Sequence, residues 1–399
     1  MPAAACTIVD KRQLAHARVT AASFARHNPG IPFFTGLADR VDGAFDPAAE
    51  PFTTIELAAV GLPAEAAMPF RLADDELAYA TTPFLIEHLL DRGYDRVLFF
   101  KRESLVTGDH AASLELLEDA AIVLTPHLLT PLAGEESERE LDVLLAGTYN
   151  VGFLGIAESP AARAMLRWWQ ERLREHCRHD VMGGLHFEQR WVDLVPGMFD
   201  GVRVTRDPGA SIGHWSLPER RVEIDGEDVR VDGRPCRLVR FSGYDLDHPE
   251  AATRYHDRLA VADAGGDAAA LFRRYRELVL AAGHAEARAL PYAFAAFDNA
   301  VPVPAVARAL HSRLGRRAAA FGDPFATAGP GSFWAWLTGA DEELGGVTRL
   351  WASIVRARPD VHAAYSGADG LDLRGLGGWA DNTGRAEHAI PGGFPLAAA

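Results

Sequence analysis

The sequence predicts an α/β fold with a mostly parallel central sheet and a helical C-terminal region. Over the first 125 residues, short apolar runs alternate with stretches of helical periodicity, as expected for strands separated by helices. After about residue 255 the pattern changes to arginine-rich helices with Gly-rich breaks between them. We therefore expect an α/β domain over residues 1–255 and a helical region over residues 256–399.

The chain begins with a predicted strand, helix and strand. A short apolar run at residues 6–9 predicts the first strand, and apolar residues at helical spacing from Leu14 to Ala25 predict the helix that follows. Pro29 and Gly30 end this helix because neither residue continues helical geometry. A second apolar run, residues 31–38, predicts the next strand.

Two further strands are expected at residues 96–100 and 120–125, the first of them preceded by a helix over residues 84–90. Successive strands separated by helices indicate a parallel sheet with both faces covered. Such sheets bind ligands at the carboxyl ends of their strands. The residues directly after the four predicted strands are therefore where we expect a binding site.

The remaining elements are peripheral to that edge. Ser159-Pro160 is a typical helix start, and apolar residues then recur at helical spacing to Cys177. Residues 221–238 predict a hairpin, because Asp-Gly pairs separate alternating apolar positions. Further helices are expected at residues 271–281 and 303–314.

Composition limits the function. The chain has 399 residues and a formal net charge of −15, so attraction to nucleic-acid phosphate or to an anionic bilayer is not expected to drive its function. Three cysteines without a CxxC pair argue against a disulfide framework and a four-thiolate zinc site. The N-terminus lacks an export-signal pattern, and no stretch of eighteen apolar residues occurs. We expect a cytoplasmic protein that binds neither nucleic acid nor membrane.

Nine stretches spanning most of the chain carry a family resemblance. They are CTIVDKRQLAHARVTAASFARHNPG (6–30), PFLIEHLLDRGYDRVLFF (83–100), VLTPHLLTP (123–131), ELDVLLAGTYNVGFLGI (140–156), WWQERLREHC (168–177), FEQRWVDLVP (187–196), FSGYD (241–245), PYAFAAFDNAVPVP (291–304) and AGPGSFWAWL (328–337). These stretches resemble a bacterial glycosyltransferase family of the GT-A fold, related to the retaining transferases that act on UDP-hexoses. The resemblance implies a Rossmann-like α/β domain that binds a nucleotide-diphospho-sugar, with the nucleotide held by strand-end loops.

The resemblance also implies a metal site, from which this chain departs. In the family an Asp-x-Asp motif after a central strand holds a divalent cation on the diphosphate, but Lys101-Arg102-Glu103 stands there in this chain. Arg240 occupies the position where related enzymes have a metal-binding histidine. Ammonium and guanidinium groups do not hold a cation, so we expect no divalent metal.

Two interpretations of these substitutions stay open. In the first, Lys101, Arg102 and Arg240 place fixed positive charge on the diphosphate in place of the metal. In the second, catalysis has been lost and the strand end carries solvated charges. Lys101 is one of only two lysines among 40 basic residues. Glu103 either orients Lys101 or a sugar hydroxyl, or forms a surface ion pair.

The expected nucleotide contacts follow the first strand. Thr7, Val9 and Asp10 either contact uracil or ribose, or Asp10 simply caps the next helix. Arg71 matches a basic family position, with a solvated charge as the alternative. Thr82 replaces a lysine that the family often has before Pro83.

Sugar chemistry is expected in three segments. Asn150 is a candidate for binding the donor or acceptor sugar, with a β-bulge as the alternative. Glu188-Gln189 stands where the family has Asp-Gln near the anomeric centre, and two exposed polar residues in a first helical turn are the alternative. His214-Trp215 resembles the acceptor loop, although an isolated Trp is often a core residue.

These observations predict a metal-independent bacterial glycosyltransferase that moves a hexose from a nucleotide-diphosphate sugar, UDP-linked by resemblance, to an acceptor that the sequence does not identify. Retention of configuration is favoured by resemblance alone. The alternative is a catalytically silent homologue that binds the nucleotide-sugar or acts as a scaffold.

Overall fold

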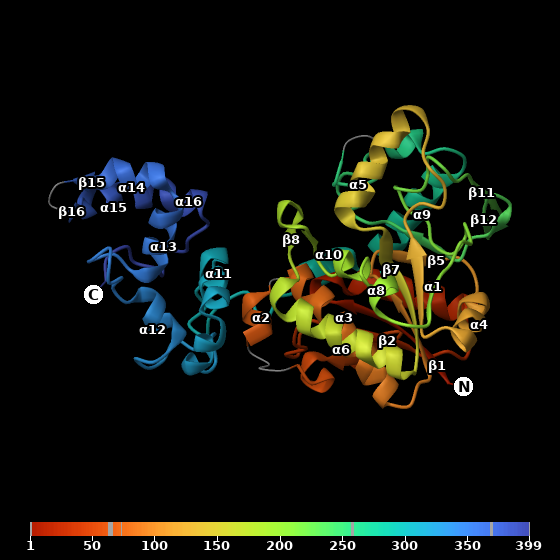
Figure 1. Ribbon diagram of the computed structural model, residues 1–399, viewed down its shortest axis with the longest axis horizontal. Helices are drawn as coiled ribbons and strands as arrows, with labels where there is room; N and C mark the ends of the chain where they lie inside the picture. The colour runs from red at the N-terminus through yellow and green to blue at the C-terminus, as the bar shows by residue number, and fades with distance from the viewer. Residues whose placement is uncertain (1, 63–66, 73, 257–258, 368–369, 399) are drawn as a thin grey trace. The chain divides into compact units, whose positions relative to one another are not determined.

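The computed structural model describes residues 2–62, 67–72, 74–256, 259–367 and 370–398 (Figure 1). The chain divides into two compact units. The first comprises residues 1–62 and 74–292, and the second comprises residues 63–73 and 293–399. The first unit therefore continues to Tyr292, beyond the boundary at residue 255 expected from the sequence.

A seven-stranded mixed sheet forms the centre of the first unit. Its spatial order is β10 (Val202–Val204), β6 (Ile122–Pro126), β7 (Tyr149–Ala157), β4 (Arg96–Phe100), β1 (Ala3–Val9), β2 (Phe33–Leu37) and β3 (Thr53–Glu56). Neighbouring strands are parallel except at β7, which runs antiparallel to both β4 and β6. The predicted α/β fold with a mostly parallel sheet is confirmed.

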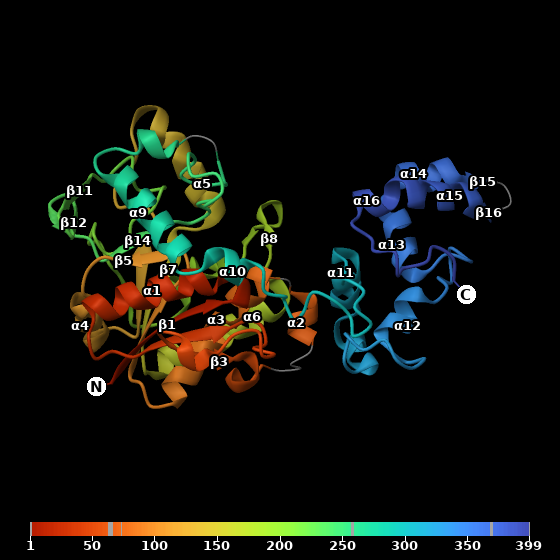
Figure 2. The same cartoon turned by 180° about the vertical axis from the view of Figure 1, so that it is seen from behind.

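Helices cover both faces of this sheet. α3 (Asp74–Asp91) and α6 (Pro160–His176) lie in front of it in Figure 1, whereas α1 (Leu14–His27) lies in front in the reverse view of Figure 2. α6 begins as the sequence predicts, because the side chain of Ser159 accepts a hydrogen bond from the Ala162 amide and Pro160 follows it. Under α1 and α4 (Ala111–Asp119), a buried cluster joins helix residues such as Phe24 and Leu117 to strand residues such as Phe100 and Phe153.

A second layer covers the edge where the expected site lies. β5 (Ser104–Val106) leaves the end of β4 and pairs antiparallel with β14 (Leu238–Arg240). The predicted hairpin is present as β11 (Val222–Asp225) and β12 (Asp228–Val231), extended by β13 (Arg234–Pro235). α9 (Ala268–Ala281) packs against α1 and shares a core with β14, which places it in the first unit, and α10 (His284–Arg288) follows.

Short elements surround the start of β7. They are α5 (Arg139–Ala146), a small hairpin of β8 (His179–Asp180) and β9 (Leu185–His186), α7 (Gln189–Val192) and α8 (Val195–Met198).

The second unit is helical, as the sequence predicts for the C-terminal region. Its elements are α2 (Ala67–Arg71), α11 (Ala305–Leu314), α12 (Phe333–Thr338), α13 (Arg349–Ala357), α14 (Pro359–Tyr365), α15 (Leu373–Trp379), α16 (Arg385–Glu387) and the strand pair β15 (Ser366–Gly367) and β16 (Gly370–Leu371). Phe70 of α2 is fully buried against the rings of Phe297, Phe325 and Phe333. Across both units, no helix of the described residues has the length and apolar character needed to cross a membrane.

Candidate active site

The antiparallel strand β7 brings three segments to one point. Because β7 runs against its neighbours, its amino end meets the carboxyl ends of β4 and β6. The Lys101 amide donates a hydrogen bond to the Gly152 carbonyl at 3.0 Å. The pairing register of β6 and β7 shifts between Leu124 and Pro126, and opposite this shift Asn150 accepts a hydrogen bond from the Gly152 amide at 2.8 Å. The β-bulge considered for this segment is therefore present, and it presents the Asn150 side chain at the strand end.

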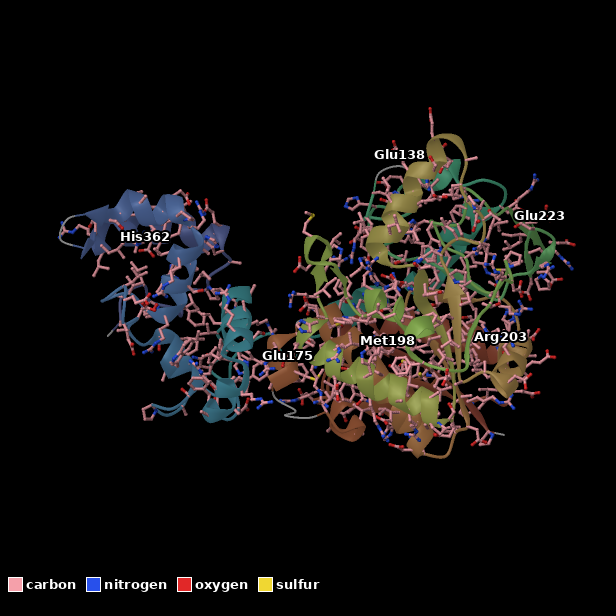
Figure 3. All side chains as sticks on the ribbon, in the orientation of Figure 1. Glu138, Glu175, Met198, Arg203, Glu223 and His362 are labelled. Carbon is pink, nitrogen blue, oxygen red and sulfur yellow. The ribbon has the colours of Figure 1, made fainter. Side chains whose placement is uncertain are left out.

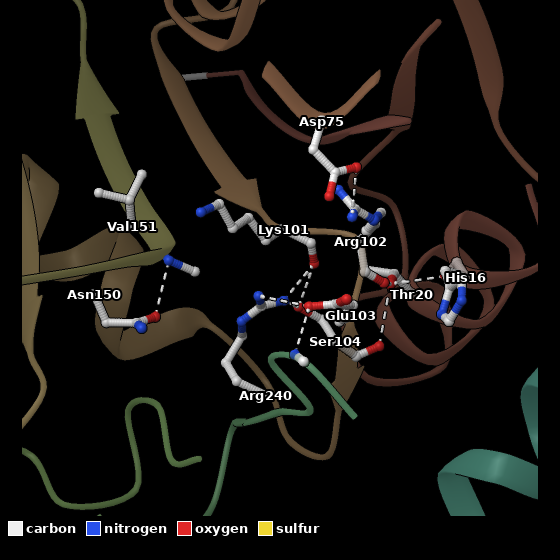
Figure 4. Close-up of polar contacts among 12 residues, drawn as sticks. His16, Thr20, Asp75, Lys101, Arg102, Glu103, Ser104, Asn150, Val151 and Arg240 are labelled. Carbon is white, nitrogen blue, oxygen red and sulfur yellow. Dashed lines mark hydrogen bonds and ion pairs between the residues drawn. The ribbon is translucent and has the colours of Figure 1, made fainter. Parts of the chain in front are cut away.

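Arg240 lies beneath this point. Its position on β14 is opposite Ser104 of β5, and its guanidinium donates to the Lys101 carbonyl at 2.9 Å and to Ser104 Oγ at 2.8 Å (Figure 4). The side chain is 1% exposed, and burial lowers the pKa of Arg240 from its usual value. Gly152 makes this position possible, since a Cβ there would collide with Arg240 Nε and Asn150 Oδ1.

Lys101 extends from the end of β4 and forms an ion pair with a buried carboxylate. Its Nζ lies 2.5 Å from Glu188 Oε1 and 4.1 Å from the centre of the Tyr79 ring. The contact to Glu188 is an ion pair without aligned hydrogen-bond geometry. The Lys101 side chain is 13% exposed and the Glu188 side chain is fully buried. Glu188 is not among the described residues that line the pocket below, and its carboxylate contacts Lys101.

Arg102 points the other way. Its guanidinium donates to Asp75 at 2.8 Å and to the Tyr79 hydroxyl at 2.9 Å. Figure 4 shows the Lys101 side chain directed away from this Arg102–Asp75 pair. The opposite directions follow from the two-residue period of an extended chain, and only Lys101 of this pair lines the pocket.

A pocket of about 270 Å³ lies beside Lys101, and its described lining residues all belong to the first unit. Three cations, Lys101, Arg139 and Arg240, and one carboxylate, Asp142, face it. The other lining residues are aromatic rings, imidazoles and small or amide side chains: Tyr79, His127, Val143, Leu145, Ala146, Asn150, His179, Val181, His186, Phe187, Gln189, His214, Trp215, Ser242, Tyr255 and His256. Four charged side chains thus line this pocket, and each of the three cations also pairs with a carboxylate outside the lining: Lys101 with Glu188, Arg139 with Glu136 and, at 3.9 Å, Arg240 with Glu103.

The imidazoles with resolved shifts are neutral at pH 7. Burial lowers the pKa of His127 to about 4 and that of His186 to about 3, and it lowers the pKa of His214 well below its usual value. His127 Nε2 lies 2.9 Å from Asn150 Nδ2, and His214 Nδ1 lies 3.2 Å from His256 Nε2. The positive charge of the pocket therefore comes from Lys101, Arg139 and Arg240.

The three residues at the end of β1 that the sequence predicts as nucleotide contacts are buried. Thr7 and Val9 are fully buried in the sheet, and Asp10 is 1% exposed. Asp10 caps the short turn after β1 by accepting from the Arg12 amide, and it also pairs with the Arg12 guanidinium at 2.7 Å. None of the three lines the pocket. The alternative interpretation of Asp10, a cap, describes its position.

Two other predicted residues, Glu103 and Arg71, are not among the described residues that line the pocket. Glu103 accepts a hydrogen bond from the Gly243 amide at 3.4 Å, and its carboxylate lies 3.9 Å from Arg240. Arg71 belongs to the second unit, where its Nε donates to His311 at 3.2 Å.

Four predicted sugar-side residues do converge on the pocket: Asn150, Gln189, His214 and Trp215. The Gln189 side chain accepts from the Val151 amide and donates to the Ala146 carbonyl, so it joins β7 to α5. Trp215 is 8% exposed, and its indole N–H has no hydrogen-bond partner among the described residues. That N–H is a buried donor whose hydrogen bond the described residues leave unmade.

Sequence reasoning missed several pocket residues. His127 directly follows β6, and strand ends were where a site was expected, so its position could have indicated it. Tyr79, Arg139 and His186 lie on helices or in a hairpin that the fold brings in from distant parts of the chain, and no local pattern indicates them. Within the described ranges, no three His, Cys, Asp or Glu side chains are placed to hold a metal ion.

Comparisons with known proteins complete the description. No family model matches the chain. Two proteins of Bacillus subtilis (strain 168), the uncharacterized proteins YfnF and YfnD, are 26% identical over 172 residues and 24% identical over 175 residues. These matches cover 42% and 43% of this chain and 57% and 54% of the relatives, so the chain spans about half the length of the curated relatives it matches.

Similar solved structures include the galactosyltransferase LgtC in complex with donor and acceptor sugar analogues, at 14% identity and a TM-score of 0.40, covering 69% of this chain and 95% of that one. The glycosyltransferase GlyE of Streptococcus pneumoniae TIGR4 is 15% identical with a TM-score of 0.42, covering 74% of this chain and 67% of that one.

Proposed function

We propose that this chain is a glycosyltransferase that takes a hexose from a nucleoside-diphosphate sugar, with UDP as the nucleotide, and that it needs no divalent cation. The observation that carries the proposal is the pocket beside Lys101, which three cations and one carboxylate line in a chain of net charge −15. Such a pocket favours an anionic ligand. The sequence resemblance described above supplies the chemical class.

The leaving nucleoside diphosphate needs positive charge near the oxygen that is released from the anomeric carbon. In this proposal Lys101 supplies that charge as a compact ammonium group, and Arg240 supplies a rigid guanidinium beneath it. Hydrogen bonds from Arg240 to the Lys101 carbonyl and Ser104 fix the guanidinium before a ligand arrives. A pre-oriented charge stabilises a developing anion without reorganisation during the reaction.

Glu188 acts as a positioning residue in this proposal. Its buried carboxylate holds Lys101 beside the Tyr79 ring while the pocket is empty, and Lys101 turns toward phosphate when the donor binds. Asn150, His214 and Trp215 bind the sugars, because they combine hydrogen-bonding groups with ring faces that pack on the apolar side of a sugar ring.

Calorimetric titration of UDP tests the proposal, first with excess chelator and then with manganese. We expect the same dissociation constant in both. A tenfold tightening by manganese, which corresponds to about 1.4 kcal/mol, would contradict metal independence. Release of UDP from a panel of UDP-sugars then measures transfer or hydrolysis.

A second candidate function is binding of the nucleotide-sugar without transfer. It is favoured by the burial of Glu188, which leaves Asp142 as the carboxylate among the described lining residues. UDP binding without UDP release over the whole donor panel supports this candidate, whereas absence of UDP binding contradicts both.

A further inference from the structure

The helix α5 exposes an apolar face to solvent. Leu141, Leu144 and Leu145 are 59%, 63% and 53% exposed. They account for three of the ten strongly exposed large hydrophobic side chains among the described residues. Scattered single exposures are normal, but three leucines on one helix of eight residues form a contiguous patch of the kind that marks an interaction site.

The two faces of α5 have different partners. At 100° per residue, Arg139, Asp142, Val143 and Ala146 share one side of the helix, and all four line the pocket beside Lys101. Leu141 and Leu144 share the opposite side, and Leu145 lies at the edge between them, where it also lines the pocket. One helix therefore carries the wall of the pocket on its inner side and an uncovered apolar stripe on its outer side.

α5 is held firmly in this orientation at its C-terminal end. The Gln189 side chain donates to the Ala146 carbonyl at 3.0 Å and accepts from Val151 of β7 at 3.1 Å. Arg190 of α7 donates to the Leu144 carbonyl. Because the residue before Gln189 is the ion-pair partner of Lys101, α5 is connected through one short segment to the proposed diphosphate site.

The charged residues around the apolar stripe indicate which kind of partner could bind it. Residues 133–146 contain five acidic residues and one basic residue: Glu135, Glu136, Glu138, Glu140 and Asp142 against Arg139. Arg139 is buried and paired with Glu136. Glu135 and Glu138 are exposed, and Figure 3 shows Glu138 projecting at the amino end of α5. A second copy of this chain would bring like charges together, and an anionic bilayer would be repelled.

We infer that the outer face of α5 docks a cationic, amphipathic helical segment of a partner protein. Leucines of α5 accept the apolar side of that segment, and the exposed Glu135 and Glu138 pair with its basic side. If the proposed function holds, this contact brings a protein acceptor to the mouth of the pocket, because the docking helix and the pocket wall are the same helix.

Fluorescence anisotropy with the full chain tests the inference. The probe is a labelled 14-residue helical peptide of leucine and lysine with one apolar side, compared with the same peptide carrying glutamate in place of lysine. We expect the Leu/Lys peptide to bind and the Leu/Glu peptide not to bind. The double variant Leu141→Gln/Leu144→Gln should weaken binding of the Leu/Lys peptide at least tenfold.

A matched control is available on α9. Leu278 and Leu280 are 39% and 42% exposed, and the double variant Leu278→Gln/Leu280→Gln should leave peptide affinity unchanged. The variant Glu135→Gln/Glu138→Gln should weaken binding and reduce its salt dependence, because exposed charges are screened by salt. Circular dichroism and thermal unfolding check that each variant is folded.

Equal weakening by the α5 and α9 variants, or binding of the Leu/Glu peptide, would overturn the inference. Concentration-dependent dimerisation lost in the α5 variant would assign the face to a second copy instead. Co-sedimentation with neutral phosphatidylcholine vesicles, lost in the same variant, would assign it to lipid. UDP affinity of the α5 variant is measured separately, so failure of the proposed nucleotide site and failure of this inference give different results.

Discussion

The ends of β1 and β4 are neighbours in the sheet, and each is followed by charged residues, yet they differ in what those charges contact. After β1, Asp10 pairs with Arg12, and Lys11 pairs with Asp39 at 3.6 Å while donating to the Arg40 carbonyl. After β4, Lys101 lines a pocket together with Arg240. Both lysines are mostly buried beside a carboxylate, but only Lys101 borders a cavity.

This difference shows that a charged residue at the carboxyl end of a strand is not by itself evidence of a ligand site. What distinguishes Lys101 from Lys11 is the pocket that Lys101 lines. The six variants below test that distinction, from the largest expected effect to the smallest.

Replacing each lysine by methionine gives the largest expected effect. Both Lys101→Met and Lys11→Met leave a buried carboxylate without its cation, so each should lower the free energy of unfolding by about 4 kcal/mol. Only Lys101→Met should also weaken UDP, by about 1.5 to 3 kcal/mol, with uridine unaffected. Denaturant unfolding and calorimetric titration measure the two effects.

The double variant Lys101→Met/Glu188→Gln separates stability from binding. It removes both charges of the pair, so most of the lost stability should return while UDP binding stays weak. Recovery of UDP affinity in the double variant would show that Lys101 acts on the fold alone.

The pH dependence of the free energy of unfolding should report on the protonation of His127, which lines the pocket beside Lys101. Burial lowers the pKa of His127 from 6.5 to about 4. Between these pH values the His127 imidazole therefore binds a proton in the unfolded chain but not in the folded chain. Above pH 6.5 His127 should not lower the free energy of unfolding, and as the pH drops to 4 this residue should lower it by about 3 kcal/mol. Urea unfolding between pH 7 and 4 should show a shallower decline for His127→Gln. Identical slopes for the two proteins would place the lost protons elsewhere.

Glu188→Gln should tighten UDP binding by roughly threefold, because the carboxylate that competes with phosphate for Lys101 is removed. Uridine affinity should not change. A loss of UDP affinity would mean that Glu188 mainly orients Lys101 toward the ligand. Its competition with phosphate for Lys101 would then be the smaller effect.

Asp10→Asn should have the smallest effect on binding. The side chain is buried against Arg12 and does not line the pocket, so UDP affinity should change by less than about twofold. The free energy of unfolding should fall by about 1 kcal/mol through the weakened cap. A tenfold loss of UDP affinity would show that the end of β1 is part of the UDP-binding site.

Local patterns in the sequence predicted four of the seven strands of the sheet, β1, β2, β4 and β6, and the edge where the pocket lies, but they did not predict β3, β7 or β10. The opposite directions of Lys101 and Arg102 also followed from strand geometry. The partner of Lys101 did not, because Glu188 is 87 residues away along the chain and reaches it only after α6 and the β8–β9 hairpin fold back. Arg139 and Tyr79 were not predicted for the same reason. No local sequence pattern distinguishes a helical residue that faces a cavity from one that faces solvent.

Gly152 places a constraint on how this chain can vary in evolution. Its missing side chain leaves the space that Asn150 and Arg240 occupy, and every single-base change in a glycine codon that encodes another amino acid adds at least a Cβ. Residue 152 therefore cannot drift by small steps while both neighbours keep their positions. Homologous chains with a larger residue there should differ at 150 or 240 as well, and they should hold the ligand by a different set of charges.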